Sequence, residues 1–218
     1  RAAISHAFAR DGSAFGLIYR GFEWVAQSGC GRGPVGRPVT VSSAERVLAH
    51  VDRTDPRNHY DLHERYSRHE VDPEQFTAYQ GGEVYQSGWV TIAAVLDDDR
   101  MLLVYDEDME AWDVPGGTLH DAETLSEGVV REVREEAGVD IVPGRPHSFV
   151  EVVTTDGERE MGFNVVGFAA EPENTAVGTD LGVDDEHITD AAWFAELPEN
   201  LYQREHAVEL LARARTDR

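Results

Sequence analysis

Apolar and polar residues between positions 89 and 215 follow two periods, one typical of strands and one typical of helices. Residues 124–137 place apolar side chains three and four positions apart, which predicts an amphipathic helix, and a second helix is expected near Leu201–Arg215. Runs with the composition of strands lie at Trp89–Leu96, Met101–Tyr105, Ser148–Thr155, Met161–Ala169 and Ile188–Phe194. Strands before and after a central helix, with another helix at the end, predict an α/β fold with a mixed sheet between helical layers.

The start of the chain lacks any such period. Residues 1–43 contain the Gly/Pro-rich run Gly29–Pro38, begin without methionine and show no sustained helical or strand pattern. We therefore expect a disordered segment, or one that does not belong to the domain.

Residues 44–85 contain signals for short helices. A capped helix is expected at 46–51, and the sequence Asp72-Pro73-Glu74 is typical of a helix start with proline in the first turn. These signals predict a short N-terminal helical extension at 44–85, followed by the main domain at 86–218.

The charge of the chain restricts its partners. Forty-two Asp and Glu residues stand against 19 basic residues, which gives a net charge of −23, and every basic residue is arginine. A field of this sign repels nucleic acid and anionic membrane surfaces, so we expect neither as a partner. A lysine-free acidic surface is typical of halophilic proteins, whereas an ordinary acidic protein is the alternative.

The sequence contains few features that indicate a cellular compartment. No apolar run approaches the roughly 20 residues of a membrane-spanning helix, and no leader pattern begins the chain. Cys30 is the single cysteine, which excludes an internal disulfide and fits a reducing interior. We expect a cytoplasmic protein.

Three carboxylates share one face of the helix expected at 124–137. At 100° per residue, Glu132, Glu135 and Glu136 fall within about 100° of one another, beside an apolar stripe that contains Val129 and Val133. Like charges at this spacing repel, and a hard cation such as Mg²⁺ or Mn²⁺ would neutralise them. A solvated acidic helix face is the alternative in a chain this acidic.

The spacing around these glutamates resembles the signature of the Nudix hydrolase family, G-x5-E-x7-R-E-U-x-E-E-x-G-U, where U is a bulky aliphatic residue. Every specified position is present: Gly117, Glu123, Arg131, Glu132, Val133, Glu135, Glu136, Gly138 and Val139. Looser similarity covers about residues 86–200. Ala122, where the family often has Gly, and Gly128, where a helix would prefer Ala, are mild departures. The resemblance implies the Nudix-type α/β/α sandwich.

The resemblance also implies which residues hold the metal. Glu132 and Glu136, one turn apart, would bind Mg²⁺ or Mn²⁺ directly, and Glu135 would bind directly or through water. The carbonyl of Gly116 would be a further ligand, because glycine lets the backbone approach an ion closely.

Further roles follow from the resemblance for residues around the carboxylates. Arg131 would orient the carboxylates rather than meet the substrate, and Glu123 would tie the preceding loop to Arg131. The polar loop before Ile188 is where relatives often carry a catalytic base, and Glu186 is favoured there over Asp184 and Asp185. A loop acidic only because the whole chain is acidic is the alternative.

The family chemistry is attack by water on a phosphorus of a nucleoside diphosphate linked to another group. We therefore expect a Mg²⁺-dependent pyrophosphohydrolase with a small-molecule nucleotide substrate, either ADP-ribose or another nucleotide sugar, or a modified nucleoside triphosphate. The alternatives are a non-catalytic ligand-sensing module on the same fold, an isomerase of the isopentenyl diphosphate type, which needs a catalytic cysteine within the domain, and a plain acidic structural protein. The sequence does not decide whether the protein forms a homodimer.

Two other groups of residues are weaker candidates. His59, His63 and His69 could hold a transition metal if His59 and His63 share a helix face, although exposed helical histidines are commoner. Tyr105 and Trp112 could stack on a base, although aromatic residues at strand ends more often pack in the core or its rim.

Overall fold

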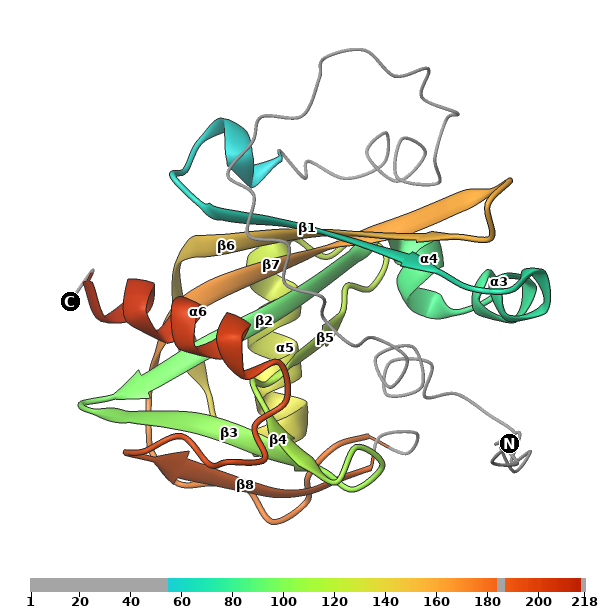
Figure 1. Cartoon of the computed structure of the whole chain (residues 1–218). Helices are drawn as coiled ribbons and strands as arrows, with labels where there is room; N and C mark the ends of the chain where they lie inside the picture. Colours follow the sequence, from blue (N-terminus) through green and yellow to red (C-terminus); the bar gives the residue numbers. More distant parts are fainter. Residues whose placement is uncertain (1–54, 184–186, 217–218) are drawn as a thin grey trace.

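The protein, seen in a computed structural model that describes residues 55–183 and 187–216, is a mixed eight-stranded sheet with helices on both faces (Figure 1). The strands are β1 (His63–Glu70), β2 (Trp89–Asp97), β3 (Arg100–Asp106), β4 (Ala111–Asp113), β5 (Gly116–Thr118), β6 (Ile141–Thr155), β7 (Glu160–Pro172) and β8 (Ile188–Phe194). The helices are the 3₁₀ turn η1 (Pro56–Asn58), α3 (Pro73–Tyr79), α4 (Glu83–Ser87), α5 (Leu125–Ala137) and α6 (Arg204–Thr216). The predicted α/β architecture is confirmed.

The strands follow the order β1-β6-β7-β2-β3-β4, with β5 paired to β2 and β8 paired to β3. The pairs β1–β6 and β2–β7 are parallel, and all the others are antiparallel. Strand β2 pairs with β3 only near its end and with β5 near its start. Because β3 and β5 pair with different parts of β2, strand β5 lies beside the helix α5, where the candidate site lies.

Strand β2 is buried on both faces because its side chains alternate between two helical layers. Ala93 and Val95 pack in the same cluster as α5, whereas Ala94 and Leu96 pack in the cluster that contains α6. Successive residues of a strand point to opposite faces, so α5 and α6 cover opposite faces of the sheet (Figure 1). The expected layers of helix, sheet and helix are therefore present.

The segment before β2 is only partly helical, in contrast to the expected helical extension. Asp72 caps α3 by accepting the N–H groups of Glu74 and Gln75, and Pro73 stands in its first turn, as predicted. Residues His63–Glu70, however, form strand β1 beside β6. Side chains of α3 and α4 pack against β2, β6 and β7, so this segment covers part of the sheet. The helix expected at 46–51 lies outside the described residues.

Helix α5 begins and ends with local signals. Thr124 and Glu127 form a capping box, in which Glu127 N–H donates to Thr124 Oγ1 at 3.2 Å and Thr124 N–H donates to Glu127 Oε2 at 2.9 Å. At the other end Gly138 takes a left-handed conformation with φ 66°. The start and the stop of the helix thus lie where the sequence predicts them, and they fix the register of its glutamates.

Replacement of Gly138 by alanine is expected to destabilise the protein by about 2 kcal/mol, measured by urea unfolding. The new β-carbon would be 2.5 Å from the α-carbon of Gly178, in addition to the cost of a positive φ. Gly88→Ala is the matched control, because Gly88 has φ 74° but no atom within 4 Å of the new carbon, and about 1 kcal/mol is expected there. Equal losses in the two variants would contradict the contact with Gly178.

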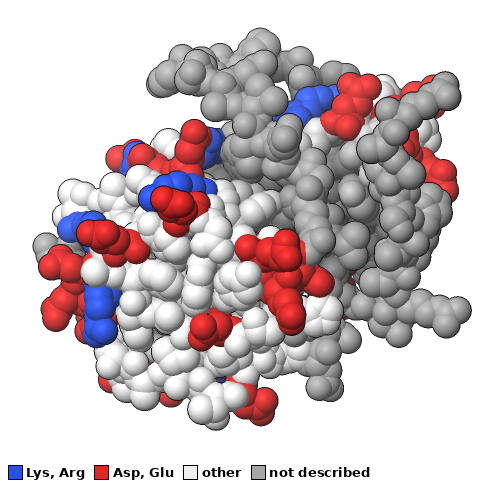
Figure 2. All heavy atoms as spheres, turned by 60° about the horizontal axis from the view of Figure 1, so that its bottom comes forward, with Lys and Arg blue, Asp and Glu red and all other residues white. Residues whose placement is uncertain are grey.

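The surface reflects the acidic composition. On the face shown in Figure 2, acidic side chains form several separate groups, and most of the arginines lie next to acidic residues. Several arginines form surface ion pairs, such as Arg134 with Asp140 at 2.6 Å and Arg68 with Glu160 at 2.7 Å. Among the described residues, no helix is both long enough and apolar enough to cross a membrane.

Candidate functional site

Two of the three glutamates on helix α5 are buried. Glu132 is 3% exposed and Glu136 is 7% exposed, whereas the side chain of Glu135 is 31% exposed. In the apolar stripe beside them, Val129, Val133 and Ala137 are fully buried and Val130 is partly buried. A solvated acidic face, the alternative considered from the sequence, therefore does not describe Glu132 and Glu136.

The backbone of strand β5 holds the Glu136 carboxylate. Gly116 donates its N–H to Glu136 Oε2 at 2.8 Å. Gly116 lies opposite Ile92 in the antiparallel pair of β5 with β2. The hydrogen bonds between these strands fall on neighbouring positions, since Ala93 N–H donates to the carbonyl of Pro115. The N–H of Gly116 is therefore free to point away from β2 and toward α5.

Gly117 provides the space in which the Glu132 carboxylate lies. A β-carbon at Gly117 would be 2.5 Å from Glu132 Oε1, closer than nonbonded atoms approach. Gly117 pairs with Thr91, an odd-numbered residue of β2, and odd-numbered residues of this strand face α5. Any side chain at position 117 would displace Glu132, so the sequence Gly116-Gly117 brings both buried carboxylates to the same strand.

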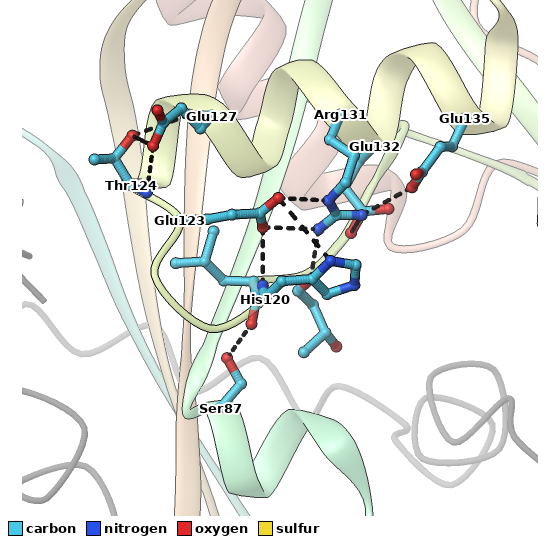
Figure 3. Close-up of polar contacts among 10 residues, drawn as sticks. Ser87, His120, Glu123, Thr124, Glu127, Arg131, Glu132 and Glu135 are labelled. Atoms are coloured by element: carbon cyan, nitrogen blue, oxygen red, sulfur yellow. Dashed lines mark hydrogen bonds and ion pairs between the residues drawn. The ribbon is translucent and has the colours of Figure 1, made fainter. Parts of the chain in front are cut away.

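Arg131 contacts three carboxylates, those of Glu123, Glu132 and Glu135 (Figure 3). Its Nε donates to Glu123 Oε1 at 2.7 Å, and its Nη1 lies 2.8 Å from Glu135 Oε2 and 2.9 Å from Glu132 Oε1. Its Nη2 donates to the carbonyl of Thr118 at 2.9 Å. A planar guanidinium can make all these contacts at once because its donors form a rigid fork.

The surroundings of Arg131 keep it charged. Burial by itself would lower the pKa of the guanidinium, but the hydrogen bond to Glu123 and the charge of Glu132 outweigh burial and raise this pKa above its ordinary value. Burial would likewise raise the pKa of Glu123, and the hydrogen bonds from Arg131 and from the N–H of His120 lower it. The arginine and Glu123 therefore form a permanent ion pair at neutral pH.

The loop before α5 has a left-handed residue at position 122, where the chain departs from the family signature. Ala122 has φ 66°, a left-handed conformation that costs alanine about 1 kcal/mol more than glycine. The usual glycine at this position would avoid that cost. Gly128 is a different case, because a β-carbon there would lie 2.2 Å from Leu119 Cδ1. Alanine has the higher helix propensity, but at position 128 it would require the buried side chain of Leu119 to shift.

The donor chemistry at the edge of α5 fits a hard divalent cation. Glu132 and Glu136 offer only oxygen atoms, which Mg²⁺ and Mn²⁺ favour, and buried carboxylates need compensating positive charge. Arg131 brings one positive charge to a group that contains Glu123, Glu132 and Glu135. Within residues 55–183 and 187–216, no group of three or more Asp, Glu, His or Cys side chains is arranged to hold a metal ion. Of the three predicted carboxylate ligands, Glu132 and Glu135 both contact Arg131 Nη1, whereas Glu136 accepts the N–H of Gly116.

A small cavity lies on the other side of Gly116, beside the start of α6. Its lining includes apolar side chains of β2, β7 and α6 and four groups that can form hydrogen bonds, Asp113, Tyr202, Gln203 and His206. Burial raises the pKa of Asp113 to about 7, although the Val114 N–H donates to its carboxylate at 2.7 Å. Burial lowers the pKa of His206 to about 4, so this imidazole is neutral. No pattern in the sequence indicates this cavity, because its residues come from four separate segments of the chain.

The described part of the structure does not bring the remaining predicted residues to this site. Glu186, Asp184 and Asp185 are outside the described residues, so the base remains a prediction. The expected helix face with His59 and His63 is wrong, because His63 lies on strand β1, where it pairs with Glu209 at 3.6 Å.

The aromatic candidates are packed against the protein itself. Trp112 makes edge contacts with Tyr105 at 5.4 Å and with Phe194 at 4.7 Å between ring centroids. Trp112 also packs against the cluster below α6. Core packing, the alternative given above, therefore accounts for their positions.

This combination of fold and carboxylate helix corresponds to a known class of protein. The model of the NUDIX domain family matches residues 87–208, more than half of the 218-residue chain. The chain therefore belongs to the NUDIX family, as the signature around α5 predicted.

Individual relatives share only part of their sequence with this chain. The chain is 30% identical over 116 residues to "Putative ADP-ribose pyrophosphatase YjhB" of Bacillus subtilis (strain 168), an alignment that covers 44% of this chain and 56% of that protein. The chain thus spans little more than half the length of this curated relative.

The solved structures it resembles include an ADP-ribose pyrophosphatase from Streptococcus suis 89-1591, with 20% identity, a TM-score of 0.43, and coverage of 60% of this chain and 91% of the other. A UDP-X diphosphatase has 18% identity, a TM-score of 0.46, and coverage of 68% and 73%. Resemblance at this level is loose, and we draw nothing about substrate from it.

Proposed function

We propose that this protein is a Mg²⁺-dependent pyrophosphohydrolase that cleaves the phosphoanhydride bond of a nucleoside diphosphate joined to another group. The observation that carries the proposal is the buried pair of Glu132 and Glu136 at the strand Gly116–Thr118, in a chain whose family signature is complete. Among substrates, ADP-ribose and other nucleotide sugars come first, because the matched curated relative is described as an ADP-ribose pyrophosphatase. Modified nucleoside triphosphates come second.

In this proposal Glu132 and Glu136 hold Mg²⁺ or Mn²⁺, with the carbonyl of Gly116 as a further ligand and Glu135 as a ligand directly or through water. The bound ion would neutralise the diphosphate and lower the pKa of the attacking water. Glu132 and Glu135 each contact Arg131 through one carboxylate oxygen in the structure, so an ion could be held by the other oxygen of each group. Glu186 is our candidate for the base that accepts the proton of the water.

Neighbouring residues orient the carboxylates for this reaction. Gly116 N–H orients the Glu136 carboxylate, and Arg131 orients Glu132 while it ties down the preceding loop through Glu123.

A non-catalytic ligand-sensing module on the same fold is the second candidate. Loss of the carboxylates would favour it, and this chain retains all of them. The hydrolase is therefore the better supported function.

The proposal is tested by a product screen in buffered high salt over ADP-ribose, other nucleotide sugars, dinucleoside polyphosphates and oxidised dNTPs. We expect one class to release phosphate-containing products with Mg²⁺ or Mn²⁺, and no class to do so with EDTA, measured by chromatography of the products. Calorimetry of Mg²⁺ binding to the same sample shows whether an inactive preparation still binds the ion. A folded protein that binds Mg²⁺ and cleaves nothing would favour the sensing module.

A further inference from the structure

Strand β1 forms one end of the sheet and has no strand on its outer side among the residues that the structure describes (Figure 1). It is eight residues long, contains no proline, and pairs with β6 through all eight residues without a bulge. The strand at the other end of the sheet order, β4, has three residues. Proteins protect edge strands by shortness, proline, bulges or charged side chains, because an open edge can pair with another chain. Of these devices strand β1 has only the charged side chains.

The direction of the backbone groups on β1 follows from its parallel pairing with β6. Val71, next along the chain, donates its N–H to the carbonyl of Thr155 on β6. In a parallel pair the residues that bond to the neighbour alternate with residues whose N–H and C=O point to the opposite side. Odd-numbered residues of β1 therefore bond to β6, and the N–H and C=O groups of the even-numbered residues Glu64, Tyr66 and Arg68 point to the outer edge, where no described strand pairs with them.

The side chains of these even-numbered residues form a charge pattern that complements itself. In the order Glu64, Tyr66, Arg68, negative and positive groups lie at equal distances on either side of an aromatic residue. Tyr66 is 53% exposed, and all three side chains lie on the same face of the strand. Arg68 pairs with Glu160 at 2.7 Å, and its guanidinium has further donors for a second carboxylate.

One antiparallel register of two β1 strands pairs the outer backbone groups along nearly the whole strand and also places opposite charges across from one another. With Tyr66 opposite Tyr66 of the partner subunit, Glu64 lies opposite Arg68 of the partner subunit, and the same pair is repeated by symmetry. A shift by two residues in one direction places Glu64 opposite Glu70 of the partner subunit, and a shift in the other direction places Glu64 opposite Tyr66 of the partner subunit. Like charges directly opposite one another destabilise a sheet, whereas opposite charges stabilise it.

We propose that the protein forms a two-fold symmetric homodimer in which the β1 strands of two copies pair antiparallel with Tyr66 on the symmetry axis. The two sheets then continue as one across the interface. The residues of the α5 site do not take part, so the proposal is independent of the proposed hydrolase activity.

The first test reverses the charges on the full-length chain and measures the dimer dissociation constant by analytical ultracentrifugation at moderate salt. E64R and R68E each replace two attractive pairs by two repulsive ones, so each is expected to weaken the dimer about tenfold. The double variant E64R/R68E restores opposite charges and is expected to dimerise like the parent protein. The differences should shrink as salt rises, because exposed charges are screened.

A second test uses cross-linking in a background with C30S. Y66C is expected to form a disulfide-linked dimer on mild oxidation, because α-carbons in a hydrogen-bonded antiparallel pair lie about 5.5 Å apart, within the range of disulfides. E70C, on the same face of the same strand, would place the two cysteines roughly 27 Å apart and should not cross-link. A parent protein that stays monomeric at micromolar concentration, or a dimer that the charge reversals do not change, would overturn the proposal.

Discussion

Replacement of Glu136 by glutamine is expected to lower turnover by a factor on the order of 10² or more, with the fold unchanged. Glutamine has almost the same shape, and its amide oxygen can still accept the N–H of Gly116, which Glu136 accepts at 2.8 Å. The negative charge is lost, and with it the neutralisation of a bound divalent ion at a position only 7% exposed. Turnover is measured at saturating substrate over a range of Mg²⁺ concentrations, after the substrate has been identified.

The matched control is Glu127→Gln on the same helix. It removes the same charge, and glutamine can keep the capping box with Thr124, so turnover like that of the parent protein is expected. Circular dichroism of both variants checks that the fold is retained. Parent-like turnover in Glu136→Gln would remove this residue from the proposed metal site.

Replacement of Arg131 by methionine is expected to have the largest effect on stability, a loss of about 3 kcal/mol at neutral pH. Methionine keeps much of the apolar length but leaves Glu123, Glu132 and Glu135 without the guanidinium that contacts all three. Glu132 is almost fully buried, so its charge has no access to water to replace this contact. The free energy of unfolding is measured in urea, and a fall in Tm of roughly 6–12 °C is expected for a domain of this size.

The pH dependence of that loss follows from the lowered pKa of Glu123. A carboxyl whose pKa is lower in the folded protein stabilises the fold fully above its unfolded pKa, about 4.5, and this contribution is lost as the pH falls through the folded value. In Arg131→Met the main cause of the lowered pKa is absent. The difference in stability between the parent protein and the variant should therefore be greatest near neutral pH and shrink as the pH falls below 4.5.

Arg134→Met is the control on the same helix. Arg134 pairs with Asp140 at 2.6 Å, but the two side chains are 62% and 44% exposed. Exposed ion pairs contribute little, so a change within about 0.5 kcal/mol is expected at every pH. Equal losses for the two arginines would contradict the role given to Arg131 as the centre of the carboxylate group.

The sequence was sufficient wherever local chemistry decides the structure. The apolar period of α5, the capping box at Thr124 and the left-handed Gly138 act within one or two turns, so the helix and the register of its glutamates could be predicted. The same holds for strand β8, whose bounds agree with the predicted run Ile188–Phe194. The family signature is local too, since it spans one loop and one helix.

Strand β1 and the cavity required the tertiary structure. The sequence His63–Glu70 is almost entirely polar, so it carries no apolar alternation, and it becomes a strand because β6 offers a partner. The cavity combines residues from β2, the segment 113–116, β7 and the segment 202–207, which are distant from one another along the chain. No pattern in one segment can indicate such a combination, because each segment alone has an ordinary composition.

In the candidate site, the sequence is enough to predict which carboxylates share a helix face, because helical geometry sets the angles between residues 132, 135 and 136. The contacts of each carboxylate, in contrast, depend on the tertiary structure. Glu136 accepts a backbone N–H, Glu132 lies in the space left by Gly117, and Glu135 turns to Arg131. The physical reason is that all three have the same chemistry, so their partners are set by which strand and which glycine the fold brings within reach.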